Sequence, residues 1–306
     1  MATMTETPSA IGTKTLSHDY HAEARLLRGR LRRPVEKEIE EHASLTLRGN
    51  EDRHIFDHAE DISVDGLISY TRGKTRVSGS RSLKHNGWVT LATSIVEGLN
   101  VLEIVTADRV VSQVSTDHPE MGGHIPSVTF LGTQFTNFRI SGFPVELTLN
   151  LGICGDKPAG DRSYLRDPAF LYRVKEQTAA IAAAAGLPNE LKRQYDERLH
   201  VIEGLIRTSN ADDPDPRKPI KCSLVQSINV VGEIPIPGVQ VFGHILVIPA
   251  FGSVALGEIE VGETMYEDSK RPCVYFTMTN FNLKMGCVGD GEASAAATTA
   301  NGNTHP

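Results

Sequence analysis

The sequence has no excess of positive charge and no long apolar run. Its 306 residues include 31 Lys or Arg against 38 Asp or Glu, which gives a formal net charge of -7. Because most of such a surface repels a polyanion, we do not expect a nucleic-acid partner. No apolar run approaches the ~20 residues that a helix needs to cross a bilayer, so no membrane segment is expected.

A secretory signal and a disulfide framework are also missing. Residues 1–15 are polar and lack a basic stretch followed by an apolar one, so a cytoplasmic location is expected. None of the four cysteines belongs to a CxxC pair or a short metal-binding spacing; they are Cys154, Cys222, Cys273 and Cys287. Their apolar surroundings favour buried thiols over a disulfide.

Familiar catalytic motifs are missing as well. The sequence contains no phosphate-binding glycine loop, GxSxG elbow or paired zinc ligands in a suitable structural context. No repeat of ~20 to 50 residues is evident, which disfavours a solenoid or propeller. A catalytic site can still be assembled in space from distant residues, so the sequence predicts a fold more clearly than a function.

What the sequence does contain is a β-rich stretch from Trp88 to Thr116. Val, Ile and Thr dominate it, and their branched Cβ atoms fit a pleated sheet better than a helix. Small breaks at 97–99 and 107–108 predict three strands, at 88–96, 100–106 and 109–116. The nearly continuous apolar runs indicate strands covered on both faces, so we place this meander centrally.

The N-terminal part alternates polar and apolar residues. A strand is predicted from His21 to Pro34, and a second one over 35–47 is favoured over a helix that would begin at Pro34. Five arginines of the first segment face four glutamates of the second, so charge pairing across the two strands is favoured over an anion site. We interpret 50–61 as a polar loop and 62–82 as a hairpin that turns at 72–74.

The character of the sequence changes at Asp167. Asp167 is an N-cap residue, Pro168 suits the first helical position, and Gly186 ends the run, so a helix is predicted over 168–185. A second helix begins near Pro188 and carries apolar residues at spacings of three and four. The short connection predicts an antiparallel helical hairpin.

The predicted fold class is mainly β, an antiparallel β-sandwich or barrel-like core with an inserted α-helical hairpin. The last segment is interpreted either as a small-residue edge strand or as a tail. The predicted segments are a disordered tail (1–19), a β-rich segment (20–153), the helical hairpin (164–207), a linker (208–219), a β-rich segment completing the core (220–290) and the C-terminal segment (291–306).

The first candidate site is the loop after the central meander, which brings two carboxylates and two imidazoles together beside a Gly-Gly turn. These side chains could act in acid/base catalysis or bind a divalent metal, and a solvated turn is the structural alternative. The candidate catalytic residues are Asp117, His118, Glu120 and His124. The candidate metal ligands are His118, His124, His54 and His58, with Asp57 beside the last two. No other cofactor is predicted.

A second candidate site is a basic stretch flanked by two aromatic residues, a combination that can bind a small anionic or sugar-like ligand. The alternative is that these charges only keep a sheet edge soluble. The candidate ligand-binding residues are Tyr70, Arg72, Lys74, Arg76, Arg81, Lys84 and Trp88.

For function, the sequence favours a non-enzymatic binding or structural protein that self-associates into a homo-oligomer. This hypothesis rests on the missing catalytic motifs and on the strand and hairpin surface that is free for assembly. The alternative is a β-barrel-type enzyme with a metal-dependent or acid/base site in the loops around 117–124.

Overall fold

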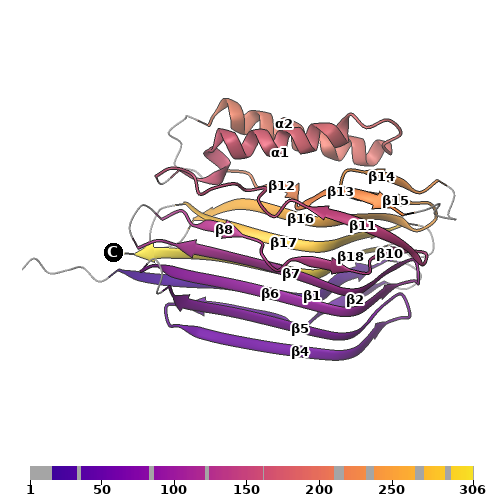
Figure 1. Cartoon of the computed structure of the whole chain (residues 1–306), viewed down its shortest axis with the longest axis horizontal. Helices are drawn as coiled ribbons and strands as arrows, with labels where there is room; N and C mark the ends of the chain where they lie inside the picture. Colours follow the sequence, from indigo (N-terminus) through magenta and orange to yellow (C-terminus); the bar gives the residue numbers. More distant parts are fainter. Residues whose placement is uncertain are drawn as a thin grey trace, which may run out of the picture.

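Two antiparallel sheets lie face to face in the computed structural model, and a pair of helices lies along one long side of them (Figure 1). This arrangement confirms the predicted mainly β sandwich with a helical hairpin. The residues that the structure describes are 16–32, 36–82, 86–120, 124–160, 162–209, 217–231, 238–265, 272–286 and 291–305.

Sheet A unites the N-terminal and C-terminal strands. Its strand order is β14-β15-β16-β17-β18-β1-β2, with β12 paired to β16 and β3 paired to β1. Its strands are β1 (Ser17–Leu31), β2 (Lys37–His42), β3 (Leu45–Gly49), β12 (Ile220–Ser223), β14 (Gln240–Phe242), β15 (Ile245–Ile248), β16 (Gly252–Met265), β17 (Pro272–Met285) and β18 (Gly291–His305).

Sheet B contains the central part of the chain. Its order is β13-β11-β10-β7-β6-β5-β4, with β8 and β9 paired to β7. Its strands are β4 (Arg53–Val64), β5 (Ile68–Arg81), β6 (Trp88–Val101), β7 (Val105–His118), β8 (Ser127–Thr129), β9 (Gln134–Thr136), β10 (Arg139–Ile140), β11 (Phe143–Leu149) and β13 (Val225–Val230).

The predicted three-strand meander is instead a hairpin of two long strands, β6 and β7. The residues taken for turns lie inside these strands, where Gly98 has a φ of 66° and the ladder passes from the pair Glu97 and Arg109 to the pair Leu99 and Ala107. The register is the same on both sides of the missing pair, so the positive φ at Gly98 bends the strand without adding a residue to it or ending it. The prediction was wrong because a glycine that bends a strand and a glycine in a turn give the same signal in the sequence.

The bend at Gly98 belongs to a line of irregularities that crosses both sheets. In β4 of sheet B, Asp61 has a φ of 50°, and in sheet A Gly257 and Ala296 have φ values of 58° and 53°. At each of these positions the ladders skip one pair. The long strands bend together near one end in Figure 1. The buried residues accordingly form two large clusters, one on each side of the bend.

The segment 50–61 is a strand rather than a polar loop. Residues 53–64 form β4, and the chain turns at Asp65 and Gly66, both of positive φ, before β5 begins at Ile68. The predicted turn at 72–74 therefore lies within β5. The high density of charged residues hid the strand, because an edge strand that is exposed on one face tolerates a polar sequence.

The two ends of the described chain pair with each other in the middle of sheet A. β18 lies between β17 and β1 and pairs with β1 from Ser17 opposite His305 to Leu31 opposite Gly291. The C-terminal segment is therefore an inner strand, neither a tail nor an edge. Of the predicted N-terminal tail, 17–19 belong to β1 and 1–15 lie outside the described residues. Residues 210–216 of the predicted linker lie outside them too.

The sheets approach closely where β1 crosses β5. Tyr20 and Leu26 of β1 are almost fully buried and pack directly onto Gly79 and Gly73 of β5, at the places where Cβ atoms would otherwise stand. Alanines such as Ala22 continue this small-residue layer in the core. Glycine is required at 73 and 79 because any side chain there would push the sheets apart.

The helices begin as the sequence predicts. The Asp167 carboxylate accepts a hydrogen bond from the Phe170 backbone N–H at 2.9 Å, and α1 runs over Pro168–Ala182 after a short 3-10 turn at Tyr164–Arg166. α2 follows over Asn189–Arg207, and the ion pair between Lys175 and Glu203, at 2.9 Å, joins the middle of α1 to the C-terminal part of α2. None of the described helices is long and apolar enough to span a membrane.

A buried polar network fixes α2 to sheet A. The Arg198 guanidinium of α2 lies 3.1 Å from the Glu258 carboxylate of β16 and also donates to the Tyr195 hydroxyl at 3.1 Å. Asn282 donates to the second Glu258 oxygen at 2.9 Å, and His244 lies 3.1 Å from the Tyr195 hydroxyl. Burial opposes ionisation of Glu258, but His244 and Arg198 together hold its pKa well below the usual range.

The close approach at Gly79 gives a first prediction. Gly79→Ala is expected to lower the free energy of unfolding by ~1 to 3 kcal/mol, because the added methyl group meets the Tyr20 ring. Gly204→Ala is the matched control, since nothing lies within 4 Å of a Cβ there and alanine favours a helix by ~0.5 to 1 kcal/mol. Urea denaturation measures both variants, and equal stability changes would contradict the packing described.

The polar network gives a second prediction. Arg198→Met should cost ~3 to 5 kcal/mol, because Glu258, with 6% of its side chain exposed, would keep a buried charge without its main partner. Adding Glu258→Gln should recover part of this loss. The matched control is Lys192→Met, which breaks an α2 ion pair whose side chains are 52% exposed and should cost less than ~1 kcal/mol. A small loss in Arg198→Met would show that the network does not hold α2.

Candidate interaction site

The four residues of the predicted catalytic loop do not converge. Asp117 and His118 are the last residues of β7, and successive residues of a strand point to opposite faces. Glu120 accepts a hydrogen bond from Arg81 at 3.3 Å, and His124 is half-buried beyond a stretch, 121–123, that lies outside the described residues. In the described ranges, no group of three or more His, Cys, Asp or Glu side chains is placed to bind a metal.

His118 instead meets residues that the sequence did not associate with it. Its ring is fully buried and lies 4.6 Å, centroid to centroid, from the ring of His18 in β1. The His18 ring is stacked on Trp88, with centroids 5.1 Å apart and an 11° angle between the planes. Burial and the neighbouring His18 lower the pKa of His118 well below its usual value. A neutral, enclosed imidazole packs the core and has no path to a substrate.

His54 and His58 lie on β4, away from His118 and His124. Both are exposed, and they stand four residues apart on one face of the strand. At ~3.3 Å per residue their Cα atoms are ~13 Å apart, too far for one ion to bind both side chains. Metal binding by the predicted ligand set stays a prediction that this geometry does not favour.

The predicted ligand site is divided between the two faces of sheet B. Tyr70 and Trp88 are buried in the core, with 2% and 5% exposed, whereas Arg72, Lys74 and Arg76 are exposed on the outer face. Only Arg81 reaches one of the aromatic residues, with its guanidinium carbon 5.8 Å from the centre of the Trp88 ring. Lys84 lies outside the described residues. The sheet separates the cations from the aromatic rings, so these residues do not form one site.

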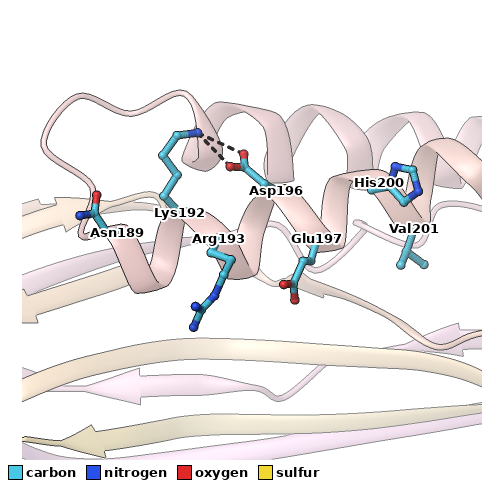
Figure 2. A pocket seen from close by; sticks show the side chains of 7 residues that line it. All are labelled: Asn189, Lys192, Arg193, Asp196, Glu197, His200 and Val201. Carbon is cyan, nitrogen blue, oxygen red and sulfur yellow. Dashed lines mark hydrogen bonds and ion pairs between the residues drawn. The ribbon is translucent and has the colours of Figure 1, made fainter.

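A hollow of about 610 Å³ lies on the outside of α2, and Figure 2 shows the side chains that line it. All its lining residues come from this one helix, and their side chains point in different directions along it. Lys192 and Asp196 form an ion pair with each other at 3.1 Å, so their charged groups already have partners. Because a ligand would touch a single helix face, this hollow is an open surface and not a built site.

The free edge of sheet B is a more distinctive surface. β4 ends the strand order, and of the described strands only β5 pairs with it. In Figure 1 it forms the border of the sandwich opposite the helices. Phe56, in the middle of β4, has 81% of its surface exposed, the largest value among the large apolar residues that are exposed. An unpaired strand with an exposed aromatic side chain is a template for pairing with another chain.

The sequence of β4 is also complementary to itself when two copies of the strand pair antiparallel. If two copies pair antiparallel about Asp57, His54 of one copy lies opposite Glu60 of the other, and Arg53 lies opposite Asp61. Arg53 and Asp61 form a pair of opposite charges, and the His54 ring can hydrogen-bond to the Glu60 carboxylate; such cross-strand pairs stabilise the pairing of two strands. Phe56 lies opposite His58 and diagonally beside the second Phe56, within reach of an aromatic ring. Only the Asp57 residues, which meet each other at the axis, oppose this register.

A family model described as "Domain of unknown function (DUF8256)" matches residues 18–262. The chain belongs to this family. The match begins in β1 and ends within β16, so it includes the β4 edge and both helices. No curated protein matches the chain. Because the description of the family states no activity, its function has to be argued from surfaces such as this edge.

The β4 edge could be found only in part from the sequence. The prediction of a polar loop included His54, Asp57 and His58 but gave no role to Phe56 between them. The alternation His54, Phe56, His58, Glu60 on one side and Ile55, Asp57, Ala59 on the other was the available signal. What the sequence could not show is that no described strand covers this edge.

The buried His118 ring gives a third prediction. Its pKa is lower in the folded state than the unfolded value near 6.5, so below pH 6.5 the unfolded chain binds more protons than the folded one. The free energy of unfolding should therefore fall as the pH drops below ~6.5, by up to ~1.4 kcal/mol per pH unit from this group. Above pH 6.5 this contribution is constant.

Thermal or urea denaturation between pH 5 and 8 tests this dependence. His118→Phe should remove that part of the slope, whereas His200→Gln, on the exposed face of α2, should leave it in place. An unchanged slope in His118→Phe would mean that His118 is protonated in the folded protein.

Proposed function

We propose that this protein is a non-enzymatic structural or binding protein that self-associates through the free edge of β4. The observation that carries the proposal is the exposed Phe56 at the centre of an unpaired, self-complementary strand. Edge pairing of two copies joins their sheets B into one continuous sheet, with a two-fold axis at Asp57.

Energetically, the pairing combines backbone hydrogen bonds with burial of one large side chain per copy. Complete burial of a Phe side chain contributes ~1.5 to 3 kcal/mol, and the ladder gives the unpaired backbone groups of β4 their partners. The charged residues on the same strand have a second role, because they oppose pairing in any other register and with unrelated strands.

The alternative, an enzyme with a site around 117–124, receives less support. Its residues would have to act from both faces of β7 and from the core, and His118 is enclosed. A general acid or base has to come within hydrogen-bond reach of its substrate.

The fourth prediction concerns assembly, measured by sedimentation velocity across micromolar concentrations. Phe56→Ser should weaken self-association by about tenfold or more, because it removes the buried aromatic contact. The matched control is Leu131→Ser, which removes a residue with 65% of its surface exposed elsewhere on the protein and should leave association unchanged. A monomeric wild-type protein, or equal effects of both variants, would refute the proposal.

Two further variants test the register. Asp57→Asn should tighten association, because it removes the one like-charge contact at the axis. His54→Glu should weaken association by placing two acids opposite each other, and the exchange His54→Glu with Glu60→His should restore it. If the exchange does not rescue the single variant, the copies do not pair about Asp57.

A further inference from the structure

The outer face of sheet A carries two adjoining hollows that share Arg25 of β1. Their volumes are about 440 and 200 Å³, and Arg25 lines both of them. The register places Arg25 opposite Ala297 of β18, and Ala297 opposite Thr279 of β17. Because the two strands beside Arg25 carry short side chains at this level, the sheet surface is depressed there between longer residues.

Arg25 differs from the other cations of this groove in having no ion-pair partner, although its charge helps to lower the pKa of Glu23. Arg28 pairs with Glu41 at 3.3 Å, Arg30 pairs with Glu36, and Lys221 pairs with Glu260 at 3.6 Å. Among the described residues the Arg25 side chain forms no hydrogen bond or ion pair, and its Nε is shielded from solvent without an acceptor. Because its Nε is shielded, an acceptor in the groove has to bind the terminal nitrogens of the guanidinium.

The charge of the lining restricts the kind of acceptor. Four cations line the two hollows, and five glutamates accompany them. This surplus of one acid disfavours a phosphate dianion or a polyanion, since both would meet more repulsion than attraction. A single carboxylate matches one guanidinium, which it can engage with two parallel hydrogen bonds.

The uncharged residues of the groove favour a ligand with hydroxyl groups. The Thr277 and Thr299 hydroxyl oxygens lie 2.9 Å apart, Thr279 follows two residues along β17, and Ser294 lies further along the groove. Ser44 and Thr46 line the far hollow. Hydroxyl side chains both donate and accept, and carboxylates such as Glu292 accept, which suits the hydroxyls of a polyol.

We propose that Arg25 is the centre of a binding site for a hydroxylated monocarboxylate, a sugar acid, in the groove over β18. The carboxylate pairs with the Arg25 guanidinium, and the ligand hydroxyls bond to the threonines of β17 and β18. This site lies on sheet A and is independent of the β4 edge of sheet B.

The fifth prediction is a titration of the full chain with glucuronate, glucose and glucose 6-phosphate at low salt, followed by chemical-shift changes or calorimetry. Glucuronate should bind, with glucose and glucose 6-phosphate at least about tenfold weaker, since one lacks the carboxylate and the other carries a second charge. Arg25→Gln should lose about tenfold or more in affinity for glucuronate. Arg76→Gln, an exposed arginine on the other sheet, should bind like the wild type.

Two more variants keep the result interpretable. Thr279→Val keeps the shape and removes one hydroxyl, so it should weaken binding severalfold even if Arg25→Gln folds poorly. Phe56→Ser should bind glucuronate normally, which separates this site from self-association. Equal binding of glucose and glucuronate, or wild-type affinity in both Arg25→Gln and Thr279→Val, would overturn the proposal.

Discussion

The close packing of β1 against β5 is the contact on which the rest of the sandwich depends. Tyr20 and Leu26 fill the space above two glycines, so the sheets lie nearer to each other than two rows of ordinary side chains would allow. The inner strand β18 is likewise rich in small side chains, with alanine, threonine and asparagine. Such small residues bury less apolar surface per strand, so each strand contributes less hydrophobic stabilisation. Long strands with many contacts compensate for this difference.

The common bend of the two sheets follows from the same closeness. Because the sheets pack closely where β1 crosses β5, one of them cannot curve there without the other, and the positive φ at Gly98 in sheet B is matched by that at Gly257 in sheet A. Asn280 lies on this line in β17, fully buried, where the ladders on both sides skip a pair. Bends at one level in several strands therefore act as a single feature of the fold.

The predictable part of this fold was its class, and the unpredictable part was its connectivity. Branched residues and alternation identified strands almost everywhere, and Asp167 with Pro168 marked the first helix correctly. Local signals failed at Gly98, where a bend inside a strand resembles a turn, and in 50–61, where an exposed edge resembles a loop. They also failed at 291–305, because nothing local reveals that a strand of small residues is paired on both sides.

The candidate sites show a related limit. The histidines and carboxylates of 117–124 attracted attention as a group, yet a strand separates neighbours onto opposite faces, and His118 packs the core with a residue 100 positions away, His18. Phe56 and Arg25 are single residues that no motif singles out. In the described fold the Phe56 ring remains exposed, and the Arg25 guanidinium has no hydrogen-bond acceptor. Only the structure reveals these two features.

Phe56 and Arg25 lack different kinds of contact, so different partners would supply them. An exposed aromatic ring on an unpaired strand needs a surface and a backbone, which another protein chain supplies. A shielded guanidinium in a polar groove needs an acceptor, which a small ligand supplies. The two surfaces belong to different sheets, so a self-associated form keeps its grooves open. Assembly through β4 would then present two copies of the Arg25 groove in one particle, and a ligand carrying several carboxylated units would bind it more tightly than a single unit does.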